Sequence, residues 1–196
     1  MYKNFFYTTE LDFKKFSSYL PNKKSIILDY GCGNGVFTNR NLKCKKIKLI
    51  KMTDKDKKLK NFIKKKYSTN KKVVWIEGLN GKFDVVFINS VIQYMDLKEY
   101  KKLLNFFIKK KINLIIISDI PKYPRILEAF FLIFMNPFKL FKGLNYLLSK
   151  NYIKTGFYFK KFNQLIIKKK TYLFKKEINL NEDKFMRYSL IIKKIK

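Results

Sequence analysis

The stretch "SIILDYGCGNGVF", residues 25–37, places three alternating glycines directly after an aliphatic run and an acid. Glycine lets a backbone turn sharply and lets its N–H groups approach a polar ligand without obstruction from a Cβ atom. Asp29, the acid before the loop, would accept a hydrogen bond from a bound ammonium or hydroxyl group. The spacing of Gly31, Gly33 and Gly35 therefore predicts a ligand-binding turn, with a tight turn that binds nothing as the alternative.

A second acid follows the next apolar run of the sequence. Asp54 lies 23 residues beyond Gly31. In βαβ units that bind nucleotides, an acid about 20 residues after the glycines accepts hydrogen bonds from a ribose hydroxyl. The two acids together favour a nucleoside-containing ligand. A nicotinamide-dependent dehydrogenase is the alternative for the glycine loop, but it would need a small residue where Val36 stands.

Apolar runs typical of strands alternate with amphipathic stretches typical of helices along the first 120 residues. Strands are predicted at 25–30, 46–52, 72–77, 83–89 and 112–118, and helices at 9–20, from 36, at 54–67 and at 97–111. This alternation predicts a mostly parallel sheet with helices on its faces, and ligands bind such sheets at the carboxyl ends of the strands. Two more strands, at 171–180 and 186–195, are separated by a short polar link that suits antiparallel pairing.

The sequence resembles the class I S-adenosylmethionine-dependent methyltransferases of the small-molecule type, from about residue 24 to 120 and more loosely to its end. The segments "ILDYGCGNG", "MTDKDKKL" and "FDVVFINSVIQYMD" are similar to the family's first, second and fourth motifs. The resemblance implies one domain over residues 1–196, with a Rossmann-like, doubly wound α/β fold and a mostly parallel seven-stranded sheet whose last strand is antiparallel. It also implies S-adenosylmethionine as cofactor, with contacts from Asp29, Gly31, Cys32, Gly33, Gly35, Asp54, Leu79, Asn89 and Ser90.

The sequence departs from the family in two places. Leu79 stands where the family usually carries an acid that recognises the adenine amino group, with Glu77 and Asn80 nearby. The link "GLNGK", residues 78–82, has no room for a helix between the third and fourth strands, although parallel crossovers normally need a dozen residues or more. We expect that face of the sheet to be bare, or to be covered by another segment or subunit.

Asp119 is the predicted catalytic residue, because it follows the fifth strand at the edge where an acceptor would bind. The chain has no histidine, so a general base must be a carboxylate, a tyrosine or a lysine. A helix-capping or turn role is the alternative for Asp119. Gln93 and Tyr94 would either line the same pocket or pack a helix.

The expected methyl acceptor is a small molecule, a saccharide or a lipid-linked compound, modified on oxygen or nitrogen. The family members that methylate nucleic-acid bases carry Asn or Asp, Pro, Pro and an aromatic residue after the fourth strand, where this chain has "NSVI", residues 89–92. A cofactor-binding subunit without activity is one alternative, and an RNA-modifying methyltransferase is another.

The formal charge of +31 suggests nucleic-acid binding at first sight. Only Arg40, Arg125 and Arg187 of the 45 basic residues are arginines, the side chain that reads phosphates and guanine bidentately, and the lysines are scattered along the whole chain. The composition therefore argues against a nucleic-acid partner. The phenylalanine-rich insertion at 121–170 is expected to form a helical lid over the acceptor, and peripheral membrane contact through 126–148 is its alternative.

The absence of histidine excludes a Ser-His-Asp triad and any histidine-bound metal, and no metal site is expected. Cys32 and Cys44 suit neither a disulfide framework nor a zinc cluster. The N-terminal segment lacks the apolar core of a signal peptide, and the longest apolar run, 129–135, falls short of the ~20 residues of a spanning helix. These features together predict a cytoplasmic location.

Overall fold

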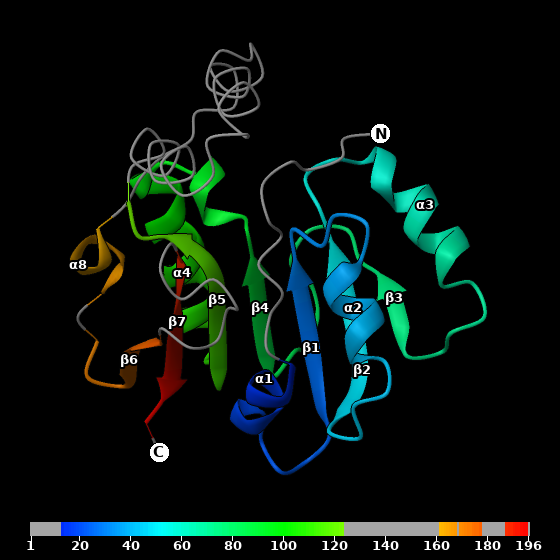
Figure 1. The fold of residues 1–196 in the computed structure, drawn as a ribbon, viewed down its shortest axis with the longest axis horizontal. Coiled ribbons are helices and arrows are strands. Elements are labelled where there is room, and N and C mark those ends of the chain that lie inside the picture. Colours follow the sequence, from blue (N-terminus) through cyan, green and yellow to red (C-terminus); the bar gives the residue numbers. More distant parts are fainter. Residues whose placement is uncertain (1–12, 124–160, 168, 178–186, 196) are drawn as a thin grey trace, which may run out of the picture.

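A seven-stranded sheet with the order β3-β2-β1-β4-β5-β7-β6 forms the centre of the protein (Figure 1). The computed structural model describes residues 13–123, 161–167, 169–177 and 187–195. The strands are β1 (Ser25–Tyr30), β2 (Ile47–Thr53), β3 (Val73–Trp75), β4 (Val85–Asn89), β5 (Leu114–Pro121), β6 (Tyr172–Glu177) and β7 (Arg187–Lys194). Because β7 pairs antiparallel with both β5 and β6, it runs against the other six strands. The predicted Rossmann-like α/β fold with an antiparallel last strand is confirmed.

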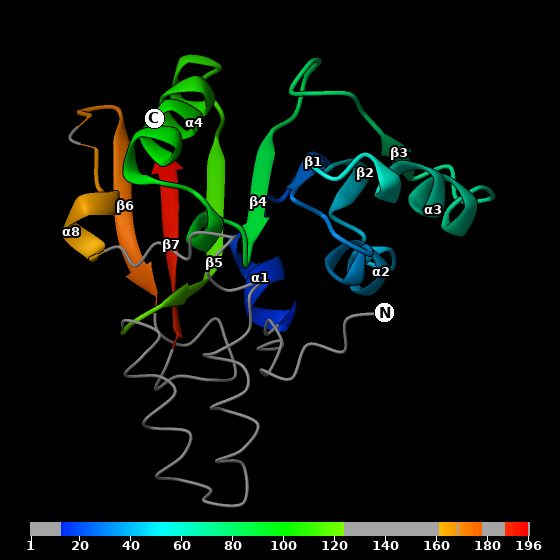
Figure 2. The ribbon, with the colours of Figure 1, turned by 90° about the horizontal axis from the view of Figure 1, so that it is seen from above.

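Helices cover both faces of the sheet. The side chains of α1 (Phe13–Tyr19), α2 (Val36–Asn41) and α3 (Lys58–Lys66) contribute to a buried cluster on one face. The 3-10 helix η1 (Ile92–Tyr94), α4 (Leu97–Lys109) and α8 (Phe162–Leu165) contribute to a second cluster on the other face (Figure 2). This double cover explains why all eight residues of β5 are buried, as its continuous apolar sequence predicts.

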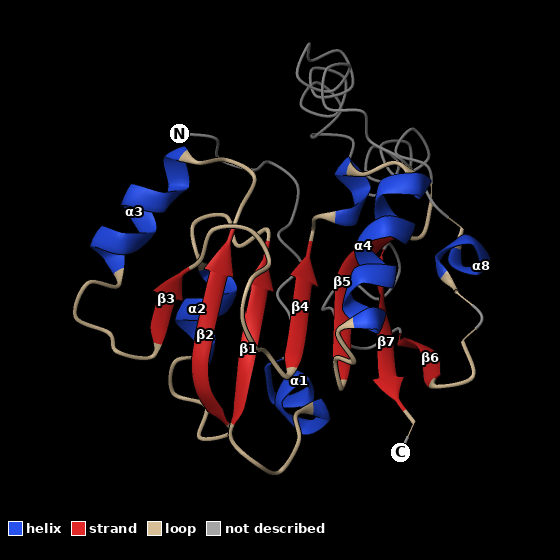
Figure 3. Ribbon diagram, turned by 180° about the vertical axis from the view of Figure 1, so that it is seen from behind, coloured by secondary structure: helices blue, strands red, loops and turns tan. Residues whose placement is uncertain are grey.

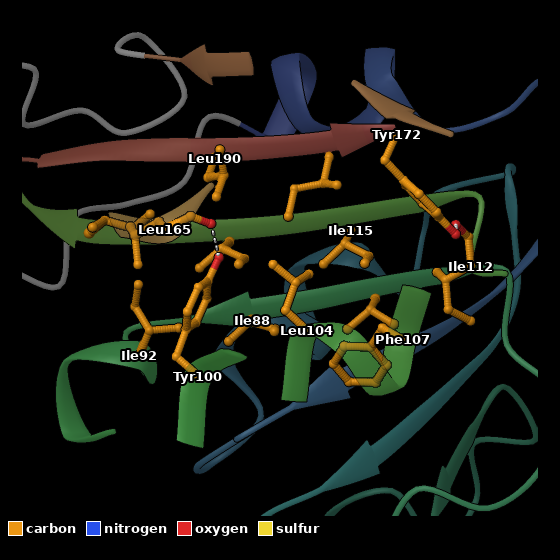
Figure 4. Packing of buried hydrophobic residues seen from close by; sticks show 14 of the residues in the cluster. Ile88, Ile92, Tyr100, Leu104, Phe107, Ile112, Ile115, Leu165, Tyr172 and Leu190 are labelled. Atoms are coloured by element: carbon orange, nitrogen blue, oxygen red, sulfur yellow. Dashed lines mark hydrogen bonds between the residues drawn. The ribbon is translucent and has the colours of Figure 1, made fainter. Parts of the chain in front are cut away.

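The second cluster packs α4 along the length of the central strands, including their carboxyl ends (Figure 4). Tyr100 of α4 is almost fully buried and donates a hydrogen bond from its hydroxyl to the Leu165 carbonyl of α8 at 2.8 Å. Phe107, in the last turn of α4, contacts Tyr30 of β1 and the Phe83 ring edge to face. The strand ends that carry the polar residues therefore rest on a closely packed apolar layer.

Among the described residues, two element boundaries differ most from the sequence prediction. Helix α3 begins at Lys58 and not at residue 54, because the Asp54 carboxylate accepts the Asp56 N–H and the Asp56 carboxylate accepts the Lys58 N–H. Such side-chain turns compete with the first turn of a helix. Strand β5 continues past the predicted residue 118 to Pro121. Residues 124–160 of the predicted lid, which include the predicted membrane contact at 126–148, lie outside the described residues, as does the start of the first helix at 9–12. The described end of the predicted lid forms α8 and packs in the second cluster.

The chain passes from β3 to β4 without a helix, as the short link predicts. The connecting loop covers part of the face that a crossover helix would occupy, since Ile76 and Leu79 pack against the cluster under α4. Val74 of β3 remains 39% exposed. The expectation of a bare face is therefore met only in part.

Within the described ranges, no helix has the combination of length and apolar character that crossing a bilayer requires.

The capping box at the start of α4 gives a test of this packing. The Asp96 carboxylate accepts the Glu99 N–H at 2.7 Å, and the Glu99 carboxylate accepts the Asp96 N–H at 2.9 Å. We expect Asp96→Ala to lower the free energy of unfolding by about 1 kcal/mol, since it leaves an amide of the first turn without a partner. Urea titration measures the change, and the exposed neighbour Lys98→Ala is the control; equal losses in both variants would contradict the assignment of the cap.

Candidate functional site

The glycine loop between β1 and α2 is tied to the end of β2 by three backbone amides. The N–H groups of Gly31 and Cys32 donate to the Thr53 carbonyl at 2.9 and 3.1 Å. The N–H group of Gly33 donates to the Asp54 carboxylate at 2.9 Å. The loop and the two acids predicted from the sequence thus meet at the carboxyl edge of neighbouring strands.

The glycines serve backbone geometry, and their amides bond within the chain; that they also contact a ligand stays a prediction. Besides the two bonds above, the Gly35 N–H donates to the Cys32 carbonyl at 2.9 Å, so all three glycine amides are used within the chain. All three glycines have positive φ, between 51° and 75°, which other residues adopt only with strain. A Cβ atom on Gly31 would also lie 2.4 Å from a methyl group of Val91. The groups left for a ligand are mainly acceptors, namely backbone carbonyls and carboxylates.

Asp29 lies beneath the loop and is 2% exposed. Its carboxylate accepts a hydrogen bond from the Thr38 hydroxyl of α2 at 2.8 Å. Burial raises the pKa of Asp29 to about 7 and the nearby Asp54 charge adds to this rise, while the Thr38 bond opposes it. Burial also raises the pKa of the Cys32 thiol, which is therefore a neutral group and no nucleophile at neutral pH.

The end of α3 holds the glycine loop from the other side. The Tyr67 hydroxyl donates to the Gly35 carbonyl at 2.9 Å, and the Lys66 ammonium donates to the Asn34 carbonyl at 2.7 Å. Burial raises the pKa of Tyr67 to about 12, so its hydroxyl stays protonated and remains a donor. Sequence reasoning missed both residues, because no spacing rule links the end of this helix to the loop.

A second polar cluster joins the ends of β4, β5 and β7. The Ser118 hydroxyl donates to Asn89 Oδ1 at 2.6 Å, and Asn89 Nδ2 donates to Ser90 Oγ at 3.2 Å. The Ser90 hydroxyl in turn donates to Asp119 Oδ2, and Arg187 Nε lies 3.4 Å from Asp119 Oδ1. The structure brings together the predicted residues Asn89, Ser90 and Asp119, and it adds Arg187, which the sequence gave no reason to select.

The backbone in this second cluster adopts two unusual conformations. Ser90 and Asp119 have φ of 56° and 59°, the left-handed region that favours glycine. At Asp119 the register of β5 against β7 shifts between Ile117 and Ile120. Each strained residue costs on the order of 1 kcal/mol or more, and such residues concentrate at ligand sites, where they orient a side chain.

The two clusters are neighbours at the same edge of the sheet. Val91, which follows Ser90 directly, is the residue that packs against Gly31. Helix η1 continues from Val91 and packs against β5. Of its residues, Gln93 is 6% exposed and its Oε1 atom has no hydrogen-bond partner among the described residues, whereas Tyr94 is 52% exposed. Most of the Gln93 side chain is therefore packed in the interior, and its Oε1 atom is an acceptor without a partner among the described residues.

The structure does not bring Leu79 to this edge. Its side chain packs in the cluster under α4, and its carbonyl accepts a hydrogen bond at 3.1 Å from Lys110, at the end of α4. Helix α4 runs back toward the amino ends of the strands, and Leu79 contacts its end. Leu79 therefore lies in the part of the loop that leads to the start of β4. Glu77, nearer the end of β3, pairs with Lys60 of α3 at 2.6 Å, which lowers the pKa of this exposed carboxyl group.

Solved structures with the same topology are methyltransferases. The chain aligns with magnesium protoporphyrin IX methyltransferase (ChlM) from Synechocystis PCC 6803 with bound SAH at a TM-score of 0.63 and 14% identity, over 93% of this chain and 81% of that one. The chain has a class I methyltransferase fold. The methyltransferase domain of bacterial CtHen1-C aligns at 0.56 and 15% identity, over 92% and 95% of the two chains.

The bifunctional kinase-methyltransferase WbdD aligns at a TM-score of 0.55 and 15% identity, over 92% of this chain and 37% of the longer WbdD chain. The sequence matches no family model and no curated protein sequence. At these identities, the methyltransferase fold is the property that the chain shares with its structural neighbours.

The hydrogen bond from the Tyr67 hydroxyl to the Gly35 carbonyl predicts that Tyr67 stabilises the glycine loop. We expect Tyr67→Phe to cost about 1 kcal/mol of stability and to speed amide hydrogen exchange in residues 31–36, because the loop loses a buried donor. Tyr100→Phe is the matched control, since it removes a buried hydroxyl that also donates to a carbonyl but lies far from the loop. Exchange in the loop that rises equally in both variants, or in neither, would contradict this role of Tyr67.

The buried Asp29 predicts a pH dependence of stability. Its pKa rises on folding from an ordinary value of 3.8 to about 7, so the folded state holds the proton more tightly. The stability that this proton contributes is complete below about pH 4 and is lost as the pH rises to about 7. We therefore expect Asp29→Asn to become progressively more stable relative to the wild type between these values. Urea titrations across this range measure the difference; parallel curves for the two proteins would refute the raised pKa.

Proposed function

We propose that the protein transfers a methyl group from S-adenosylmethionine to an oxygen or nitrogen of a small-molecule, saccharide or lipid-linked acceptor. The observation that carries the proposal is the glycine loop held between Asp29 and Asp54, at the carboxyl ends of adjacent strands of a methyltransferase-type sheet. The solved ChlM structures, which share the fold, contain SAH or SAM.

The chemistry of the loop fits this cofactor. Among the described residues, a Cβ atom added to Gly33 would meet no atom within 4 Å, so they leave this side of the loop open. The Asp54 carboxylate accepts two backbone N–H groups, and its remaining lone pairs can accept the ribose hydroxyls. The Asp29 carboxylate and the loop carbonyls are acceptors for an ammonium group. When bound, the cofactor would supply an electrophilic methyl group on its sulfonium.

The second polar cluster is the proposed acceptor site. Ser90 and Arg187 engage one oxygen each of the Asp119 carboxylate and so fix its orientation. A carboxylate oriented in this way is the type of group that binds or deprotonates an acceptor hydroxyl. The unsatisfied Gln93 Oε1 is a second acceptor for a donor group of the substrate. Holding the nucleophile in line with the methyl group contributes much of the rate in such displacements.

A cofactor-binding subunit without activity is the second candidate. The observation that favours it is the region after β3, where Leu79 faces the α4 cluster and Glu77 is engaged by Lys60. No acid at the family position is then left to recognise adenine, so cofactor affinity would depend on the loop, Asp29 and Asp54.

The decisive experiment combines calorimetric titration of S-adenosylhomocysteine with a methyl-transfer assay from labelled cofactor over a panel of hydroxyl and amine acceptors. We expect binding and transfer by the wild type, and a loss of about 10²-fold or more in kcat with unchanged cofactor affinity for Asp119→Asn. The exposed Asp56→Asn is the control. Binding without transfer to any acceptor supports the inactive subunit, and the absence of binding overturns the proposal.

A further inference from the structure

We propose that the exposed side of α3, with its flanking residues, binds the surface of an anionic phospholipid bilayer. This surface lies beside the glycine loop and apart from the acceptor cluster, and its assignment does not depend on methyl transfer.

An exposed phenylalanine lies at the centre of this surface. Phe62 is 49% exposed, although its neighbour Ile63 is almost fully buried. At the helical spacings i−4, i+3 and i+4, Phe62 is surrounded by Lys58, Lys65 and Lys66, and the Lys66 ammonium lies 5.7 Å from the centre of its ring. An apolar side chain encircled by lysines is typical of helices that lie in a membrane interface.

The lysine density of this segment exceeds that of the rest of the chain. Residues 55–66 contain seven lysines in twelve positions, against 45 basic residues in 196 for the whole sequence. Within the described residues, only Lys60 of this segment pairs with an acid, Glu77. The one acid inside the segment, Asp56, accepts the Lys58 N–H. The charge is therefore concentrated and largely available to an anionic surface, which attracts each nearby lysine.

The surface continues to the start of α2. The Lys66 ammonium donates to the Asn34 carbonyl in the glycine loop, so α3 and this loop are in contact. Val36, two residues later, is 52% exposed. The exposed apolar side chains at both places have no polar tip, which suits insertion between lipid headgroups.

A bilayer explains these features better than a nucleic acid does. No arginine stands among residues 55–66 to form bidentate phosphate contacts. Single-stranded nucleic acids bind to series of aromatic stacking platforms, whereas this surface offers one phenylalanine and one valine. A bilayer beside the glycine loop would also bring a lipid-linked acceptor to the site, a consequence that rests on the proposed function.

Vesicle sedimentation tests the surface with variants that separate apolar contact from charge. The comparison uses Phe62→Ser and, as matched control, Leu173→Ser on β6, an exposed apolar residue at the opposite edge of the sheet (Figure 3). Both substitutions leave the net charge unchanged. Lys58→Gln with Lys65→Gln is compared with Lys101→Gln and Lys102→Gln on the exposed side of α4, a pair that removes the same charge elsewhere.

We expect the wild type to bind phosphatidylserine-containing vesicles at moderate salt and not pure phosphatidylcholine vesicles. Phe62→Ser should weaken binding about fivefold or more, and its control should not. The lysine pair on α3 should likewise have a larger effect than the pair on α4. The proposal is overturned if Phe62→Ser and Leu173→Ser have equal effects and the two lysine pairs also have equal effects, because binding would then reflect unspecific attraction by net charge. It is also overturned if the α3 variants lose oligonucleotide binding without losing vesicle binding. Cofactor titration of the Phe62 variant separates a failure here from a failure of the proposed function.

Discussion

The hydrogen bond from the Gly33 amide to the Asp54 carboxylate joins the loop after β1 to the end of β2, and the arrangement of the site depends on it. Together with the two amides that donate to Thr53, it uses the donors of the loop within the protein. The loop therefore has one conformation without needing a ligand to impose it. Such preorganisation reduces the entropy that a ligand must lose on binding. It also affects what kind of ligand fits, since the amides of Gly31, Cys32, Gly33 and Gly35 already donate within the protein.

The site combines rigid support with groups that are costly to bury. The packed layer under α4 and the hydroxyl of Tyr67 hold the strand ends and the loop from different sides. Against this support stand the buried Asp29, with its raised pKa, and the strained backbone of Ser90 and Asp119. Groups that reduce stability in this way are concentrated at functional sites. That they gather at one edge of the sheet is the main structural reason to place a function there.

The sequence predicted those features that depend on local patterns. Apolar periodicity located the strands, and the spacing of Gly31 and Asp54 located the loop and its acidic partner. The mostly parallel sheet followed from the alternation of strands and helices, and the absence of a helix before β4 followed from the length of the link. These features are determined by residues that lie close together in the sequence.

The features that the sequence did not predict correctly, or did not predict at all, are contacts between distant segments. The loop amides were expected to face a ligand, but Thr53 and Asp54 take them because β1 and β2 are adjacent. The resemblance to the family placed Leu79 beside the cofactor, but Leu79 packs in the α4 cluster and its carbonyl accepts a hydrogen bond from Lys110. Arg187 and Asp119, which form an ion pair, are 68 residues apart in the sequence, and no sequence pattern predicts their contact.

The most direct test of the central claim is a crystal structure of the protein with S-adenosylhomocysteine. The account predicts the ribose hydroxyls within hydrogen-bonding distance of the Asp54 carboxylate, and the amino-acid portion of the ligand against residues 31–35, with the Gly33 amide still bonded to Asp54. A ligand bound elsewhere on the protein, or a loop that releases Asp54 and turns its amides to the ligand, would contradict it.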